Sequence, residues 1–354
     1  MPDWGLLQDD ILLWLRLVRT WNRDMAFGVA EFFGLDIGDA AVKAVLLKKA
    51  SGGYRLIGAE VCPIEASPSD EDRHRLNTIE AIRRCMASAK IETKSAVCAV
   101  SGPEVAVRTF EFPDLTAEEM EGAVTLEAAQ VCPFDVQNAA VVHQVVVKTH
   151  GKTRGVLAAA TNAVIEARRR LVEEAGLRCA LLDVEGLALL NALGLVQAGE
   201  DSDRPKAQAV LNVGTTHATL AVASPDGIPF VRDVPVPAET PQMQDLNTPL
   251  AAKGMAVDPA RADGLRPAME DVAKTIRFYL AQNPALTLEG VRVCGDLTAG
   301  RAFMDLVKGT LPVPAAVWNP MEEIDCGSAA RGRDLVRDQG PAMAVAIGLA
   351  MRTV

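Results

Sequence analysis

Two stretches of the chain repeat one pattern of apolar and polar positions. The first, residues 34–57, has apolar runs separated by a Gly-Asp turn at 38–39 and a Gly-Gly turn at 52–53. The second, residues 209–231, has the same runs with a glycine turn after Val213 and an Asp-Gly turn. Each stretch therefore predicts three strands joined by turns. Two such halves facing each other would form a cradle for a nucleotide, with a glycine turn on either side of its phosphates.

The spacing of apolar residues, together with the positions of glycine, proline and capping residues, predicts further helices and strands around these two stretches. Thr116 with Glu119 forms a capping-box pattern at the start of one helix. Strands that alternate with helices predict an α/β fold whose sheets are covered on both faces. We expect helices at 70–90, 116–131, 163–175, 185–197, 268–282, 298–309 and 341–352, and strands at 95–100, 103–112, 139–148, 154–161, 179–183 and 290–294.

Residues 1–30 form an extension whose apolar side chains recur at three- and four-residue steps. Such spacing predicts an amphipathic helix. This helix can pack on its own domain, dock on a partner or lie on a membrane surface, and its weakly basic polar face, which includes acids, argues least for the membrane. Six prolines between 235 and 267 predict irregular structure. The stripe consists of Trp4, Leu7, Ile11, Trp14, Val18, Trp21 and Met25.

Composition narrows the class of protein. The chain has 354 residues, 49% of them hydrophobic, and a formal net charge of -10, which argues against a nucleic-acid partner. Its seven cysteines and four histidines show no ligand spacing, so we expect no metal held by side chains alone and thiols that stay reduced. No charge-free apolar run is long enough for a transmembrane helix, and no basic segment precedes residues 11–15 as in a signal peptide.

Several motifs, taken together in order and spacing, carry a resemblance. They are residues 34–38 (Gly-Leu-Asp-Ile-Gly), 126–130 (Leu-Glu-Ala-Ala-Gln) with 133–134 (Pro-Phe), 183–185 (Asp-Val-Glu), 278–280 (Phe-Tyr-Leu) and 341–350. From about residue 33 to its end the chain resembles the PilM family of actin-like proteins of type IV pilus assembly, and more distantly the FtsA family. The resemblance implies an actin-like α/β fold, in which a ribonuclease H-like unit is duplicated into two lobes with covered mixed sheets.

The resemblance also implies a division into parts. After the extension at 1–31, the first lobe would comprise 32–96, 183–208 and 330–354. A subdomain at 97–182 would be inserted into it. The second lobe would comprise 209–329, with a reduced, proline-rich region at 235–270.

In actin-like proteins the first glycine turn holds the terminal phosphate and its Mg²⁺, and by resemblance Asp36, Gly38 and Lys43 match that site. Asp39 departs, because the family places Ser or Thr there. A carboxylate about 4 Å from a phosphate charge costs about 1 kcal/mol in water and about 4 at an effective dielectric of 20. Alternatively, Asp39 caps its own turn.

The second turn departs as well. Asn212 stands where the family has Asp, and an amide lacks the charge that holds hydrated Mg²⁺. Asn212 can equally be a neutral residue at a strand end. Gly214, Thr215 and Thr216 retain the pattern for a β-phosphate.

At the adenosine position only Gly295 remains of the family's glycine run. Asp296 and Leu297 carry side chains where base and sugar would approach, although Asp296 could bond a ribose hydroxyl. Asp271 stands where the family has Glu, with Lys274 after it, and an ion pair on the helix surface also explains both.

Glu185 matches the junction that leads to the cleft. It can orient water for hydrolysis or simply stabilise the start of its helix. We predict from the departures that ATP or ADP with Mg²⁺ binds weakly or not at all, and that ATPase activity is weak or absent.

The function of the chain would then be to bind other proteins through its surface. By resemblance, a groove in the 97–182 region takes the extended tail of a PilN-like inner-membrane protein, and other pilus-assembly proteins are further candidate partners. The chain would be a cytoplasmic scaffold of a pilus or type II secretion-like machine, at the membrane through its partner or through helix 1–30. The alternatives are an active actin-like ATPase and an FtsA-like division protein. Each expected groove residue can equally be an ordinary core residue; the set is Phe110, Phe112, Leu115, Val131, Pro133 and Phe134.

Overall fold

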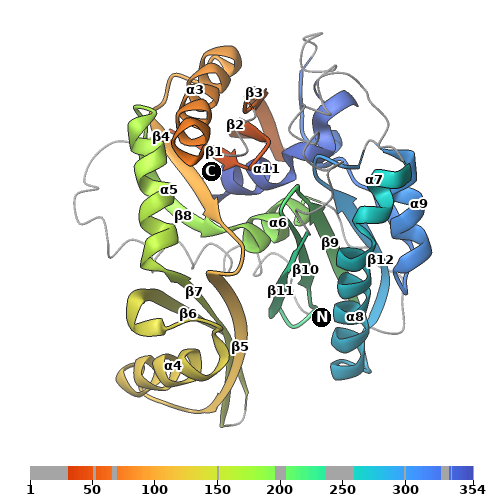
Figure 1. Cartoon of the computed structure of the whole chain (residues 1–354). Helices are drawn as coiled ribbons and strands as arrows, with labels where there is room; N and C mark the ends of the chain where they lie inside the picture. Colours follow the sequence, from red (N-terminus) through yellow and green to blue (C-terminus); the bar gives the residue numbers. More distant parts are fainter. Residues whose placement is uncertain are drawn as a thin grey trace.

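The chain folds into two lobes and a smaller third sheet (Figure 1). The computed structural model describes residues 31–50, 53–65, 70–149, 151–195, 205–236, 259–298, 300–327, 335 and 337–353. The helix expected at 1–30 and most of the proline-rich segment expected at 235–270 lie outside these residues.

The first lobe is built on a five-stranded sheet in which β1, β2 and β3 form an antiparallel meander. β4 and β8 then add parallel to β1, giving the order β3-β2-β1-β4-β8. Helices α3 and α5 cover one face, where apolar side chains of both helices meet those of the strands. The bounds are β1 (Phe32–Ile37), β2 (Ala41–Ala50), β3 (Gly53–Pro63), α3 (Glu71–Ala89), β4 (Ser95–Val100), α5 (Asn162–Glu174) and β8 (Arg178–Val184).

The second lobe repeats this plan with the strand order β11-β10-β9-β12-β13. The N–H of Gly38 donates to Ala41 O at 3.1 Å, and the N–H of Gly214 donates to His217 O at 3.0 Å, so both glycine turns close in the same way. The predicted duplication is therefore confirmed, although β13 was not foreseen. The bounds are β9 (Lys206–Val213), β10 (His217–Ala223), β11 (Pro229–Pro235), α7 (Pro259–Gly264), α8 (Arg266–Gln282), β12 (Thr287–Cys294), α9 (Arg301–Thr310) and β13 (Ala315–Val317).

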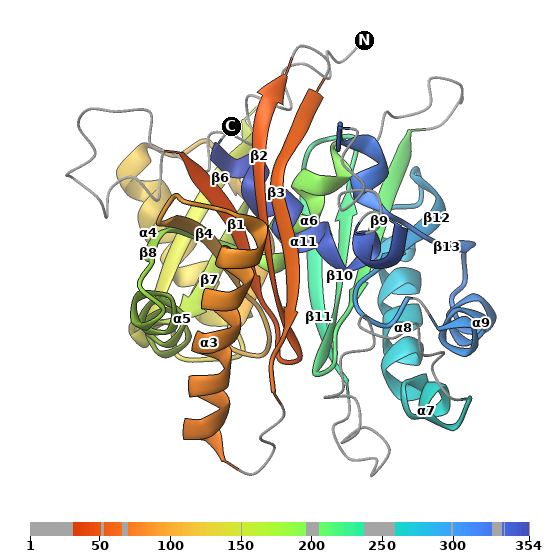
Figure 2. The same ribbon diagram turned by 90° about the horizontal axis from the view of Figure 1, so that it is seen from above.

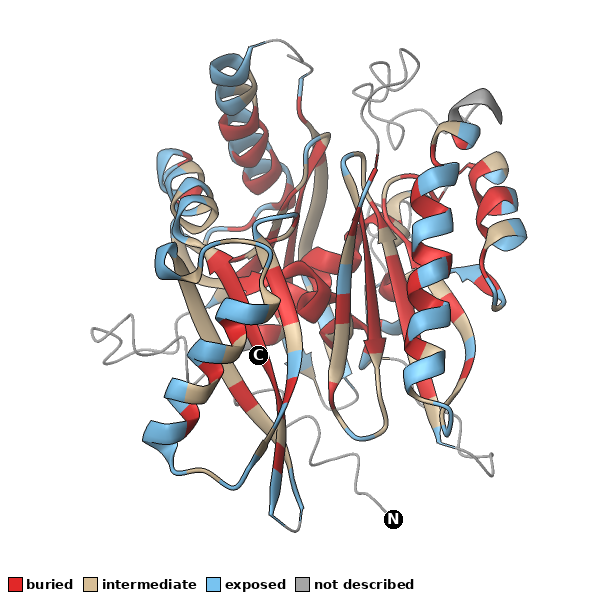
Figure 3. Ribbon diagram, turned by 60° about the horizontal axis from the view of Figure 1, so that its bottom comes forward, coloured by how far each residue is buried: buried red, intermediate tan, exposed pale blue. Residues whose placement is uncertain are grey.

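Two buried helices, α6 (Glu185–Leu193) and α11 (Ala344–Ala350), lie between the two large sheets (Figures 2 and 3). The two helices lie so close that the backbone of one contacts the backbone of the other at glycine positions. A Cβ added at Gly348 would lie 1.8 Å from Ala188 O, and one at Gly34 would lie 2.0 Å from Ala346 O. The apolar cluster around them takes side chains from both lobes, so the lobes share one core.

The third sheet, in the order β5-β7-β6, is antiparallel and carries α4 on one face. The expected capping box is present, since Thr116 and Glu119 each bond the other's backbone. The expected boundaries at 97 and 182 fall inside β4 and β8, which belong to the first sheet; the division into subdomains stays a prediction. The bounds are β5 (Val105–Pro113), α4 (Ala117–Val131), η2 (Val136–Asn138), β6 (Ala139–Thr149) and β7 (Lys152–Thr161).

Other helical expectations need small corrections. α6 ends at Leu193 rather than near 197, and short 3-10 turns, η6 (Gly340–Met343) and η7 (Met351–Thr353), flank α11. Within the parts of the chain listed above, no helix combines the length and the apolar character needed to cross a bilayer.

Candidate functional site

The two glycine turns and the end of β12 meet where the two lobes face each other, and the buried side chain of Lys43 lies among them. Asp36 lies opposite Lys43 in the β1–β2 pairing, and its carboxylate is 3.5 Å from Lys43 Nζ. Asp296, which follows β12 in the other lobe, is 2.9 Å from the same Nζ. Burial alone would lower the pKa of Lys43, but Asp296 and Asp36 outweigh it and raise that pKa. Burial raises the pKa of Asp36 to about 6, although Lys43 opposes the shift.

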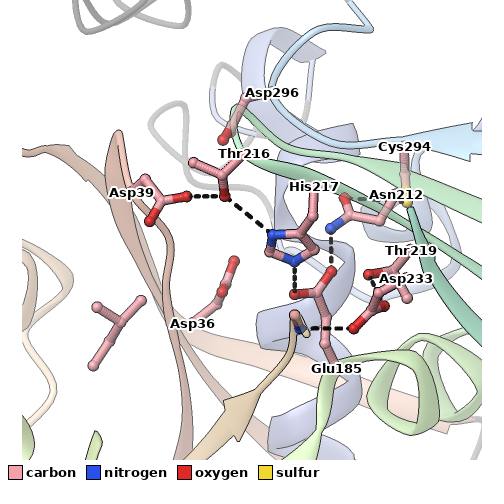
Figure 4. Close-up of polar contacts among 12 residues, drawn as sticks. Asp36, Asp39, Glu185, Asn212, Thr216, His217, Thr219, Asp233, Cys294 and Asp296 are labelled. Atoms are coloured by element: carbon pink, nitrogen blue, oxygen red, sulfur yellow. Dashed lines mark hydrogen bonds and ion pairs between the residues drawn. The ribbon is translucent and has the colours of Figure 1, made fainter. Parts of the chain in front are cut away.

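Glu185 is the first residue of α6 and is buried beneath the second glycine turn. Its carboxylate accepts a hydrogen bond from Asn212 Nδ2 at 2.8 Å and lies 3.1 Å from His217 Nε2 (Figure 4). Burial would raise the pKa of Glu185, but its partners His217 and Asn212 lower it to about 2. Burial would lower the pKa of His217, but Glu185 raises it to about 9. The pair is thus carboxylate and imidazolium at neutral pH.

The two turns also touch each other directly. Thr216 Oγ1 donates to Asp39 Oδ2 at 2.5 Å and lies 3.1 Å from His217 Nδ1 (Figure 4). Asp39 therefore reaches across to the other lobe, an arrangement that neither sequence alternative included. Thr216 and Asp39 lie in corresponding turns of the two lobes, so the duplicated turns face one another.

Thr216, His217 and Glu185 line up like a nucleophile, a base and an orienting acid. A general base must be able to take a proton near neutral pH. With a pKa of about 9, the imidazole of His217 already carries that proton. The hydroxyl of Thr216 donates to Asp39. This geometry therefore does not support hydrolase chemistry of the serine type.

Asp233 of β11 is a further residue at this junction of the lobes, and no motif in the sequence indicated it. Its carboxylate accepts hydrogen bonds from Gly102 N at 2.7 Å and from Thr219 Oγ1 at 2.8 Å. Burial raises its pKa. Because Gly102 follows β4, Asp233 makes another contact between the lobes. His217 was missed as well, although its place directly after the second glycine turn could have indicated it.

Several predicted site residues lie away from this cluster. Asp271 and Lys274 are on the exposed face of α8 and pair with each other at 2.8 Å, as the surface alternative expected. Leu297, expected near the adenosine, is instead 1% exposed in the core of the second lobe, where its apolar side chain is removed from water. The structure brings together Asp36, Asp39, Lys43, Glu185, Asn212, Thr216 and Asp296.

The residues present do not fit a magnesium-bound nucleotide in this arrangement. The ammonium of Lys43 is already neutralised by two carboxylates. The N–H groups of Gly38 and Gly214 are bonded within their own turns. The side-chain amide of Asn212 already has a partner at each of its two polar atoms. Its Nδ2 donates to Glu185, and its Oδ1 accepts from Cys294 Sγ at 3.8 Å. Among the residues that the structure describes, no group of three His, Cys, Asp or Glu side chains is placed to hold a metal ion.

Gly295, which follows β12, lies directly against the end of β9. Its φ of +106° lies in the region that favours glycine, and an added Cβ would lie 2.5 Å from Val213 O. The end of β12 therefore packs directly on the second glycine turn. Thr215 lies, partly buried, in that turn.

The expected groove residues divide into core and surface. Phe110 is 4% exposed and stacks on Phe112 with ring centroids 4.9 Å apart, so it lies in the core of this sheet, as the core alternative expected. The reason lies in Gly155 of β7, which leaves the space that Phe110 fills. Phe112 and Leu115 pack partly buried beside the same cluster. The other candidates, Val131 and Phe134 (partly buried) and Pro133 (exposed), follow at the end of α4.

Comparison with known proteins places this geometry in a wider context. The family described as type IV pilus assembly protein PilM matches residues 34–237 and 265–354. A solved structure described as a PilM-PilN type IV pilus biogenesis complex has a TM-score of 0.71 at 23% identity, covering 92% of this chain and 99% of that one. The fold is therefore actin-like, as predicted.

Two more distant structures also match. The cytoplasmic domain of EpsL, an inner-membrane component of the type II secretion system of Vibrio cholerae, has a TM-score of 0.42 at 11% identity, covering 87% of this chain and 93% of that one. A Bacteroides thetaiotaomicron protein with an actin-like ATPase fold and unknown function has a TM-score of 0.43 at 8% identity, covering 83% of this chain and 95% of that one.

Proposed function

The chain belongs to the family of the type IV pilus assembly protein PilM, and from this membership we propose that it is a platform rather than a motor. On this proposal it works in the cytoplasm, within a pilus or type II secretion-like assembly. It is held at the inner membrane by the tail of a PilN-like partner. Its nucleotide cleft is degenerate.

The observation that carries the proposal is that the polar groups of the cleft are bonded to one another. A triphosphate would have to separate Lys43 from Asp296 and Thr216 from Asp39. It would then face the carboxylates of Asp36, Asp39 and Asp296. Each like-charge contact at about 4 Å opposes binding by about 1 to 4 kcal/mol, depending on the local dielectric.

Calorimetric titration with Mg-ATP, together with a phosphate-release assay, tests the cleft. We expect the natural chain to give no saturable heat and no steady phosphate release. The double variant Asp39→Ser/Asn212→Asp restores the family pattern and serves as the comparison, in which we expect measurable binding. Low-micromolar binding with steady phosphate release by the natural chain would contradict the proposal.

Partner docking is proposed for the third sheet. β6 is its end strand, and its valines are half-buried on both faces. Val141 and Val145 pack toward α4, whereas Val142 and Val146 pack toward the shared core. The opposite end strand, β5, lies beside β11 of the second lobe. A long apolar end strand can accept an extended peptide as an added strand, with pockets for its alternate side chains.

Support for a PilN-like partner comes from the matched complex, whose description names PilN. Phe112, Leu115, Val131, Pro133 and Phe134 remain the proposed side-chain contacts, since they lie near the α4 face of the same sheet. A labelled peptide with the amino-terminal sequence of the partner encoded beside this chain, titrated by fluorescence anisotropy, tests this proposal.

A matched pair of variants locates the docking strand. Val147→Lys places a charge on β6, where an added strand would run. Thr109→Lys makes the same kind of change on exposed Thr109 of β5. We expect the first to weaken peptide binding about tenfold, equivalent to about 1.4 kcal/mol, and the second to leave it unchanged. Equal binding by both variants and the natural chain would exclude β6.

A further inference from the structure

The polar contacts that cross the cleft gather where the nucleotide would otherwise join the two lobes. We propose that the pairs Lys43–Asp296 and Asp39–Thr216, here called the interlobe lock, hold the lobes in one closed arrangement without any ligand. This inference rests on the proposed function, because it supposes that no nucleotide opens and closes the cleft. It goes further in assigning the nucleotide's bridging role to side chains of the chain itself.

Lys43 carries the first half of the lock. Its side chain is 6% exposed, and a buried ammonium is tolerated only with charged partners close by. Asp36 is fixed beside it by the register of β1 and β2. Asp296, at 2.9 Å, is the partner that comes from the second lobe. The shortest ion pair of Lys43 is therefore the one that joins the lobes.

The position of Asp296 is fixed by its surroundings. It follows Gly295, whose N–H donates to Pro341 O at 3.0 Å. The backbone of Gly295 also packs against Val213 at the end of β9. Asp296 consequently approaches Lys43 from a rigid turn, so forming the pair orders few additional atoms.

Asp39 and Thr216 carry the second half. They lie in corresponding turns of the duplicated halves, and the 2.5 Å hydrogen bond joins those turns to each other. Phosphates bound between the turns would have to part them. The bond is charge-assisted, which makes it stronger than a bond between neutral groups.

The apolar contacts beneath the cleft favour the same arrangement. A Cβ at Gly186 of α6 would lie 2.2 Å from Val231 Cγ1, so α6 and β11 are packed at close range. The shared core therefore holds the base of the cleft, and the interlobe lock holds its rim. A chain held at both levels would present a fixed surface to a partner.

Hydrogen exchange of the full-length chain, followed by mass spectrometry, tests the lock. We expect Lys43→Met and Asp296→Asn each to speed exchange of the two glycine turns and of residues 294–298 by about tenfold. Their double variant should be little faster than Lys43→Met alone, because that substitution already removes the Lys43–Asp296 pair. Lys48→Met, at an exposed position of the same strand, is the matched control and should leave exchange unchanged.

Lys43→Met also removes the ammonium that pairs with the buried carboxylate of Asp36, and this loss can prevent folding. In that case Asp296→Asn and Thr216→Val carry the test, since both leave the Lys43–Asp36 pair intact. Faster exchange of the turns in both folded variants supports the lock. Unchanged exchange in both overturns it.

These results are separate from those that test the proposed function. ATP turnover by the natural chain would overturn the platform proposal. Unchanged exchange in the variants would overturn the lock even where the natural chain binds no nucleotide.

Discussion

At the scale of single residues, Glu185 and His217 link stability to pH. The pKa of His217 rises from 6.5 to about 9 in the folded chain. A raised pKa means that the folded state holds the proton more tightly, so this contribution is complete below pH 6.5 and is lost as pH rises through 9. We expect the free energy of unfolding, measured with urea, to fall by about 3 kcal/mol across that range.

The variant His217→Gln provides the control, because glutamine does not titrate in this range. Its stability should change less between pH 6.5 and 9 than that of the natural chain. Asp36 does not interfere, since its pKa is about 6 and its raised value affects stability mainly below that range. Parallel pH profiles for the variant and the natural chain would contradict the assignment to His217.

A second residue-scale prediction concerns the buried pair of Asp183 and Arg352. The Nε and Nη2 of Arg352 lie 2.5 and 3.1 Å from the carboxylate oxygens, and both side chains are almost fully buried. Removing one partner leaves an uncompensated buried charge. We expect Arg352→Met to lower the free energy of unfolding by about 3 to 5 kcal/mol, measured by chemical denaturation.

The exposed pair of Arg337 and Asp338 offers a comparison of the same charge type. Exposed ion pairs contribute little, so Arg337→Met should leave the midpoint of denaturation nearly unchanged. A similar loss for both arginine variants would show that burial of Asp183 is not the cause.

Only some residues of the site could be predicted from the sequence. The family resemblance implied that Asp36, Lys43, Glu185 and Asn212 belong to one site, and the folded chain brings them together. Their partners were not predictable in the same way. Lys43 and Asp296 are 253 positions apart, and only the folded chain decides that they meet.

At the scale of elements, the crossing of α11 with α6 and β1 depends on glycine. Because a Cβ at Gly348 would lie 1.8 Å from the backbone oxygen of Ala188, no rotamer change can relieve the contact. The helices would have to move apart. We expect Gly348→Ala to lower the free energy of unfolding by about 3 kcal/mol or more, measured by urea denaturation.

Gly122, inside α4, is the matched control. A Cβ there would meet no atom within 4 Å, and alanine suits a helix interior better than glycine. We expect Gly122→Ala to raise the free energy of unfolding by about 0.5 to 1 kcal/mol. Destabilisation by both variants would indicate a general effect of helix substitution rather than the close crossing.

The limits of sequence reasoning for elements are visible in α3 and β13. The helix expected at 70–90 is present as α3, but Leu76, an apolar residue within it, is 57% exposed. Ile82 lies near the middle of the buried side of this helix. At 3.6 residues per turn, Leu76 is about 120° around the helix axis from Ile82 and therefore points away from that side. β13 has three residues, too few for a period to be detected. Capping residues such as Thr116, by contrast, act locally and were predicted correctly.

At the scale of the whole molecule, the duplication could be predicted because each half carries its own glycine turn. The relative placement of the halves could not. It depends on α6 and α11, whose nearly uniform apolar sequences show that they are buried without showing against what. The shared cluster joins Val97 of the first lobe to Val210 and Val231 of the second. No pattern within either half encodes such contacts.

This shared core leads to a prediction for unfolding. When two lobes bury one core, neither can unfold without exposing apolar surface of the other, so both should unfold in one transition. Met269→Ala alters the core of the second lobe and Ile82→Ala that of the first, and both side chains are fully buried. We expect each variant to lose about 2 to 5 kcal/mol. Calorimetry should show one transition, shifted to lower temperature, in both variants. Two separated transitions in either variant would mean that the lobes are independent units, and the contacts across the cleft would then add little to the stability of either lobe.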